Sequence, residues 1–243
     1  MQAPTYNHVR NRLLASLSEA DYEALHPSLE LVTLNVRDVL IEADALTTHA
    51  YFIESGIVSS VATTMDGVEV EVGVTGLEGL IGTSLLLSVD RTPHKNFVQV
   101  AGEALRVKAA DVRAIVDRHL AIWPILTRYA HCFHLQVAHT ALANGKFGVE
   151  QRLARWLLMC HDRVEGDEFP ITHEFLSVML GARRPGVTVA VQVLEGEHMI
   201  RAQRGRITIL DRQKLITAAS GSYGLPEREY RRLIEPTLTP ELT

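Results

Sequence analysis

Short runs of β-type residues dominate the first half of the chain. Between Leu29 and about Val107, segments rich in Val, Ile, Phe, Tyr and Thr are separated by turn signals such as Asp66-Gly67. Asp-Gly between two alternating runs is typical of a β-hairpin, and several short strands at this spacing predict a small antiparallel barrel or sandwich. Before this region, residues 10–26 predict one or two short helices, with Ser18 as a helix cap.

From Ala109 the apolar period becomes helical. Ala109–Arg118 predicts a short helix, and Ala121–Ala143 a long one that ends near Asn144-Gly145. Apolar and small residues at spacings of four and three form a coiled-coil-like seam along the long helix: Ile122, Leu126, Tyr129, Phe133, Gln136, Thr140 and Ala143. This seam fits a second copy of the chain or the β region, and a helix this long is expected to contact both. We assign Ile122, Leu126, Tyr129 and Phe133 to a dimer interface.

The last third of the chain contains a helix–turn–helix pattern followed by a hairpin. Val149–His161 predicts an amphipathic helix, and a short helix capped by Thr172 ends before the turn residue Gly181. Arg184–Leu194 predicts a second helix, and MIRA-QRG-RITIL a β-hairpin. This order is typical of a winged helix-turn-helix; the alternative is an αα-corner in another helical domain.

Charge and residue type favour nucleic acid as the partner of this segment. Residues 183–214 hold seven Lys/Arg and three Asp/Glu, although the whole chain has a net charge of −5. Arginine at the N-terminal end of a recognition helix can bond phosphate or guanine. We expect Arg183, Arg184, Thr188 and Gln192 to contact bases and phosphates of DNA. Thr172, Arg204 and Arg206 are expected to add phosphate contacts, which position a protein on the duplex.

Several motifs resemble those of the Crp–Fnr family of transcription regulators. They are YFIESG with the glycine-spaced segment after it, EQRLARWLL (150–158), ITHEFLSVMLGARR and RGRITILDR. The resemblance implies an α+β fold with a cyclic-nucleotide-binding-like antiparallel β-roll over residues 1–118. It also implies a long dimerisation helix over 119–145, and a winged helix-turn-helix with a C-terminal extension over 146–243. The implied partners are a second copy, double-stranded DNA with a palindromic operator, and RNA polymerase.

The expected effector pocket departs from the nucleotide-binding members of that family. Those members carry a Gly-Glu pair whose carboxylate binds ribose, whereas the corresponding segment here is Gly79-Leu80-Ile81-Gly82. A leucine cannot accept a hydrogen bond, and a buried unpaired hydroxyl costs about 1–3 kcal/mol. This argues against cyclic AMP and leaves another small molecule, or none, as the effector. The candidate pocket residues are Gly79, Leu80, Gly82, Arg91, His94 and Lys95.

Glycines at 73, 76, 79 and 82 recur every third residue. This period matches neither the dinucleotide-binding turn nor the phosphate-binding loop. The alternative to a ligand role is a tight crossing in the barrel, where side chains would clash.

Composition sets the remaining limits. The chain is 47% hydrophobic and 22% charged, typical of a folded soluble protein, and it lacks an apolar run long enough for a membrane helix. Two cysteines, Cys132 and Cys160, far apart in sequence, do not suggest a disulfide framework or a cysteine-held metal. The sequence therefore indicates a cytoplasmic protein without cofactor, metal or membrane partner, and no motif supports an enzyme.

Two alternatives remain open. The first is an effector-binding module that acts through protein partners. The second is a metal- or haem-dependent sensor of the same architecture, because His131, His134 and His139 lie on the long helix.

Overall fold

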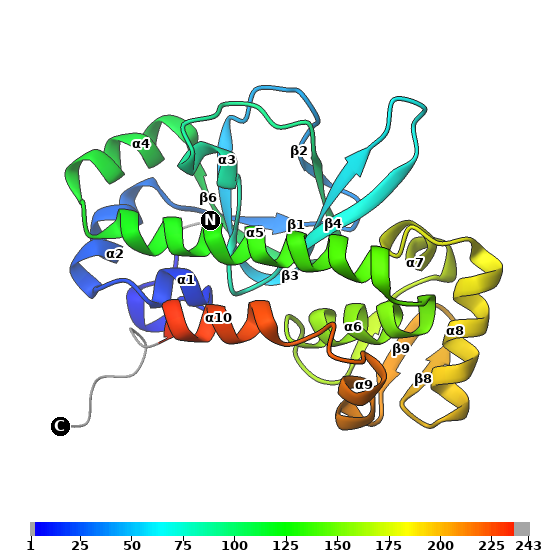
Figure 1. Ribbon diagram of the computed structural model, residues 1–243. Coiled ribbons are helices and arrows are strands. Elements are labelled where there is room, and N and C mark those ends of the chain that lie inside the picture. The colour runs from blue at the N-terminus through cyan, green and yellow to red at the C-terminus, as the bar shows by residue number, and fades with distance from the viewer. Residues whose placement is uncertain (1–2, 236–243) are drawn as a thin grey trace.

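The computed structural model describes residues 3–235, apart from the side chains of residues 116–117 and 173–174. The chain forms an N-terminal sheet-rich part, a long central helix and a C-terminal helix-rich part (Figure 1). We call the N-terminal part the sensor part, after the role that the family resemblance implies. The first part contains η1 (Tyr6–His8), α1 (Arg12–Ala15), α2 (Glu19–Leu25), η2 (His26–Ser28), β1 (Glu30–Leu34), β2 (Val39–Ile41), β3 (His49–Thr63), β4 (Glu69–Thr75), β5 (Leu80–Ile81), α3 (Thr83–Leu86), β6 (Lys95–Lys108) and α4 (Ala109–Arg118). The rest contains α5 (Ile122–Lys146), α6 (Val149–His161), β7 (Glu168–Pro170), α7 (His173–Met179), α8 (Arg184–Gly196), β8 (Ile200–Gln203), β9 (Arg206–Ile209), α9 (Arg212–Ala218) and α10 (Leu225–Leu233).

The sensor part is an antiparallel sheet that follows the predicted β region. Its strand order is β1-β6-β3-β4, with β2 added to β6 and β5 to β3. The predicted hairpin joins β3 to β4, and Gly67 has a φ of 84°, the left-handed conformation that such a turn needs. Ser18 caps α2, since its hydroxyl accepts the Asp21 N–H at 3.1 Å.

The glycine-spaced segment is a tight crossing, as its alternative interpretation predicted. A Cβ on Gly79 would lie 2.1 Å from the Tyr129 ring of α5. A Cβ on Gly73 would lie 2.9 Å from Phe133, also on α5. The absence of these side chains therefore allows α5 to lie directly on the sheet.

The long helix differs from its prediction at its end. It continues through Asn144-Gly145 to Lys146, because the chain leaves helical geometry only at Phe147, which has φ −113° and ψ 150°. A Cβ on Gly145 would meet nothing within 4 Å, so this glycine fulfils no packing need at the helix end.

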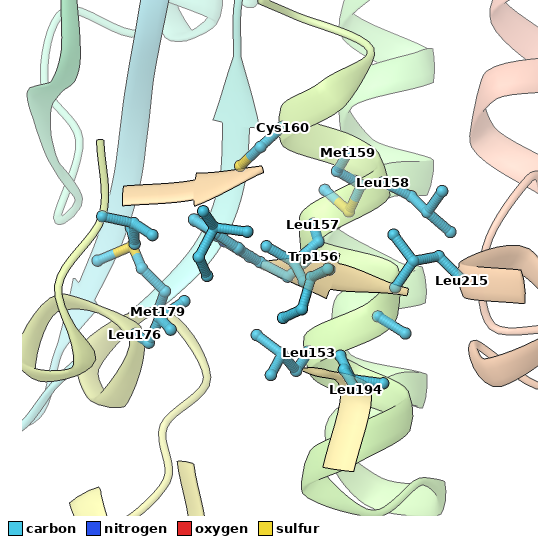
Figure 2. Packing of buried hydrophobic residues seen from close by; sticks show 14 of the residues in the cluster. Leu153, Trp156, Leu157, Leu158, Met159, Cys160, Leu176, Met179, Leu194 and Leu215 are labelled. Carbon is cyan, nitrogen blue, oxygen red and sulfur yellow. The ribbon is translucent and has the colours of Figure 1, made fainter. Parts of the chain in front are cut away.

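The C-terminal part shares its core with the sensor sheet. Its largest hydrophobic cluster combines α6, α7, α8 and the three-stranded sheet β7-β9-β8 with Ile57 and Val74 of the sensor. Figure 2 shows Leu153, Trp156 and Leu157 of α6 in this cluster, between Met179 on one side and Leu215 on the other. Every residue of α6 from Leu153 to Cys160 is buried, so α6 is enclosed on all sides.

The chain ends with a helix that returns to the sensor. This helix is α10, which lies along α5 of the same chain (Figure 1). Its residues Tyr230 and Ile234 belong to the same hydrophobic cluster as Leu13 and Leu14 of α1. The strand β7 and the helix α9 were not predicted. Within the described residues, we find no helix with the length and apolarity that a membrane span requires.

Candidate functional site

The helix-turn-helix is built as its pattern predicted. Thr172 caps α7, since its Oγ1 accepts the Phe175 N–H at 3.2 Å. Gly181, with a φ of 52°, turns the chain into α8. The inward face of α8 consists of buried residues: Val187, Ala190, Val191 and Leu194. The opposite face is thereby held toward solvent.

That outer face carries the residues proposed to contact DNA. Arg183, Arg184 and Gln192 are exposed, and Thr188 is half-buried. Val189, 54% exposed, lies on this face too. Arg183 is the N-cap residue of α8 and makes no side-chain cap hydrogen bond, so the first backbone N–H groups of the helix are left without that partner.

The wing brings the predicted phosphate-contact residues next to α7. Arg204 and Gly205 form the turn between β8 and β9 with positive φ values of 44° and 79°. The Gly205 carbonyl accepts the Ile171 N–H at 2.7 Å, which places the wing tip beside Thr172. Arg206 is exposed and pairs with Glu168 of β7 at 2.7 Å. Glu168 could not be found from the sequence, because its three-residue strand is too short to show a period.

The structure contradicts three of the four dimer-interface assignments. Ile122, Leu126 and Tyr129 are at most 2% exposed in the single chain. They pack with the sensor residues Leu80 and Leu105 in one hydrophobic cluster. The seam therefore faces the chain's own β-roll, the second option that the pattern left open. Phe133 packs at the edge of the same cluster and is half-buried.

The predicted effector-pocket residues do not form a single site. A cavity of about 90 Å³ is lined by Leu80, Gly82 and His94. Arg91 instead donates to the Asp44 carbonyl, and Lys95 pairs with Glu69. Gly79 lies under the Tyr129 ring. Leu80 is a buried core residue of β5, and the glycine with left-handed geometry in this segment is Gly82, with a φ of 102°.

Sequence reasoning missed two hydroxyl residues of this small cavity. Thr83 follows the turn glycine directly, and Ser84 comes next; both line the cavity. Within the described residues, the buried Ser84 Oγ has no hydrogen-bond partner. A cavity of 90 Å³ is nevertheless well below the roughly 300–1,000 Å³ of typical ligand pockets.

A buried carboxylate connects the sensor sheet to the C-terminal part. Glu71 of β4 is 3% exposed, and its Oε1 accepts the Trp156 indole N–H of α6 at 2.7 Å. Burial raises the pKa of Glu71 to about 7. Hydrogen bonds from Ser59 and Trp156 lower it in part, as do the positive charges of Arg163 and Arg155. This contact crosses the interface between the two parts of the chain.

A second buried ion pair lies at the same junction. Arg163, after α6, pairs with Glu78 at 2.8 Å, with side chains 6% and 14% exposed. Arg163 Nη1 also donates to the Met159 carbonyl at 2.6 Å. The carboxylates of Glu78 and Asp162 favour the charged form, and the pKa of Arg163 is raised although its burial opposes this.

The histidines of α5 are not gathered in one place. His131 lies 3.6 Å from Glu229 of α10. Over the described side chains, no three His, Cys, Asp or Glu residues are grouped so as to hold a metal ion. Cys132 and Cys160 are buried free thiols, and burial raises the pKa of both, that of Cys132 to about 12.

Comparison with known proteins identifies both parts of the chain. Residues 31–119 match the family model of the cyclic nucleotide-binding domain, and residues 151–218 match that of the Crp-like helix-turn-helix domain. The chain belongs to the Crp–Fnr family of transcription regulators. It is thus a DNA-binding transcription regulator.

Solved structures of Crp–Fnr regulators have the same fold. FixK2 from Bradyrhizobium japonicum has a TM-score of 0.68 at 16% identity, covering 78% of this chain and 96% of that one. A Crp/Fnr-family regulator from Eubacterium rectale has a TM-score of 0.67 at 17% identity, covering 86% and 98%. A CRP-family regulator from Thermus thermophilus has a TM-score of 0.66 at 18% identity, covering 79% and 98%. No curated protein sequence matches the chain.

Proposed function

We propose that this Crp–Fnr regulator binds a palindromic DNA site as a homodimer, with α8 in the major groove. The observation that supports this is the outer face of α8. Arg183 and Arg184 at its N-terminal end and Gln192 further along are exposed, while its inner face is buried. A helix N-terminus in the groove brings its first residues to base edges, and arginine can bond guanine there. Arg204 and Arg206 at the wing tip contact the phosphates.

Dimerisation uses the solvent face of α5 rather than the buried seam. Residues at spacings of four and three follow this face, all exposed or half-buried: Trp123, Thr127, Ala130, His134, Ala138 and Ala141. Most are small, which allows a second helix to approach closely, and Trp123 is 37% exposed. Two copies that pair α5 with α5 place their two α8 helices on one side as symmetric readers of two half-sites.

DNA selection with the purified protein at low and high salt tests the DNA-binding proposal. We expect an enriched palindrome and an affinity that falls steeply with salt, because phosphate contacts release counterions. Arg184→Ala should weaken binding to the selected site by about 1–3 kcal/mol and relax the preference at one base pair. Arg113→Ala, which removes an exposed arginine of α4 in the sensor, is the matched control and should leave affinity unchanged. Selection that enriches no sequence at either salt concentration contradicts the proposal.

Light scattering tests the dimer face separately. Ala138→Glu places a charge on each facing helix and should give a monomer at micromolar concentration. Ala110→Glu, at an exposed alanine of α4, is the control and should remain dimeric. A dimer that survives Ala138→Glu places the interface elsewhere.

A further inference from the structure

The structure has a second, larger cavity, separate from the small one between α3 and β6. It has a volume of about 360 Å³ and lies between α5 and α10. Cys132 and Gln136 of α5 contribute to one wall, and Tyr230 of α10 to the opposite one. Arg163, after α6, and Glu78 of the sensor also line it. This volume is four times that of the small cavity and falls in the range of small-molecule sites.

The wall formed by α10 is firmly attached. The Tyr230 hydroxyl donates to the Glu78 carbonyl at 2.7 Å, and Arg128 of α5 donates to the Leu233 carbonyl at 3.4 Å. Ile234 is 1% exposed. The cavity therefore exists because the C-terminal extension, which lies beyond the residues matched to the helix-turn-helix family, packs against the sensor.

The charged groups deep in the cavity are balanced within the chain. Arg163 pairs with Glu78, and Arg212 pairs with Asp162 at 2.6 Å. Glu227 accepts the Gly224 N–H at 3.0 Å and lies near Arg163. These groups therefore already have partners within the chain.

The lining holds four arginines and four carboxylates, but two of the arginines are exposed and have no ion pair among the described residues. These two are Arg12 of α1 and Arg231 of α10. Glu235, next to the C-terminal end of α10, also lines the cavity. Burial raises the pKa of Tyr230, and the opposite charges of Arg12 and Glu235 both act on it, so both side chains lie near α10. The planar guanidinium group binds carboxylate and phosphate through two parallel hydrogen bonds.

We propose that this cavity binds a small anionic molecule whose carboxylate or phosphate group lies between Arg12 and Arg231. The less polar part of the molecule lies against the rings of Tyr129 and Phe133, which also line the cavity. Because the site is closed by α10, the ligand stabilises the attachment of the C-terminal extension to the sensor. An effect of this ligand on DNA binding rests on the proposed function, whereas binding of the ligand to the cavity does not.

Calorimetric titration with citrate and with inorganic pyrophosphate tests the site. We expect at least one of them to bind with a dissociation constant of about 1 mM or tighter. Arg12→Gln combined with Arg231→Gln should weaken that binding at least tenfold. The control combines Arg113→Gln with Arg228→Gln, two exposed arginines outside the cavity lining, and should bind as the unaltered protein does. Tighter binding of pyrophosphate assigns a phosphate ligand, and tighter binding of citrate a carboxylate.

Hydrogen exchange of the backbone amides gives a second readout. The bound probe should slow exchange in the peptide that contains Leu225–Leu233 and leave that of β1 unchanged. Binding of neither probe, or binding that the double variant leaves intact, overturns the site. The same preparations assayed on the selected DNA separate the two proposals, because DNA binding without probe binding refutes the site alone.

Discussion

The buried carboxylate of Glu71 should make the stability of the protein depend on pH. The pKa of this group is raised from 4.5 to about 7 by burial between the sensor sheet and α6. The folded state therefore holds the proton more tightly than the unfolded state does. Below about pH 4.5, Glu71 is protonated in both states and does not lower the free energy of unfolding. As pH rises, its ionisation lowers this free energy progressively, and the loss reaches its full value above about pH 7.

The magnitude follows from the size of this shift. One pKa unit corresponds to about 1.4 kcal/mol, so a shift from 4.5 to about 7 costs roughly 3 kcal/mol when the group is fully ionised. Glu71→Gln keeps an oxygen for the Trp156 N–H and removes the charge. Relative to the unaltered protein, the variant should therefore gain roughly 2–3 kcal/mol of unfolding free energy between about pH 5 and about pH 8. Any constant cost of placing an amide there cancels in this difference.

Urea unfolding followed by tryptophan fluorescence measures the effect at both pH values. Glu69→Gln, on the same strand but in a partly exposed pair with Lys95, is the control and should change stability by less than about 1 kcal/mol. A difference between Glu71→Gln and the unaltered protein that stays constant from about pH 5 to about pH 8 refutes the reasoning, because it shows that Glu71 has the same proton affinity in both states.

Three further substitutions test the packing. Gly79→Ala places a Cβ 2.1 Å from the Tyr129 ring and should cost about 1–3 kcal/mol, read as a lower unfolding midpoint; an unchanged midpoint contradicts the tight crossing. Tyr230→Phe removes the hydrogen bond to the Glu78 carbonyl and should cost about 1 kcal/mol in urea unfolding, with faster amide exchange in α10; equal exchange shows that this bond does not hold the helix. Leu215→Ala at a fully buried position should cost about 2–5 kcal/mol, and a loss under 1 kcal/mol shows that the core refills the space.

Local periodicity was enough to predict the elements that carry the DNA-reading residues. The buried residues of α8 repeat every three to four positions, and this spacing is visible without knowledge of the partners. The hairpin at Asp66-Gly67 depends only on turn chemistry and was predicted for the same reason. These features are decided by neighbours in sequence.

Features decided by distant segments could not be predicted in the same way. The pattern of α5 showed that Ile122 and Leu126 are buried, but a pattern does not say what covers them. The cover is the sensor sheet, together with α10 from almost a hundred residues later in the chain. The same holds for the glycine-spaced segment: Gly79 and Gly82 are equivalent in spacing, and only the three-dimensional path shows that Gly82 has the left-handed conformation.

The shared core limits how this Crp–Fnr protein can transmit a signal. If an effector is to reorient α8, the C-terminal part must slide or separate from the sensor sheet. Such a motion breaks the edge-to-face contact of Phe97 with Phe175 and the hydrogen bond from Trp156 to Glu71. A ligand shifts an equilibrium only by its difference in affinity for the two states, so it must supply the free energy of these contacts. A ligand enclosed by α10 stabilises the present arrangement instead, because reorientation opens its site. Occupancy of the cavity between α5 and α10 is therefore expected to hold the DNA-reading helix where it is.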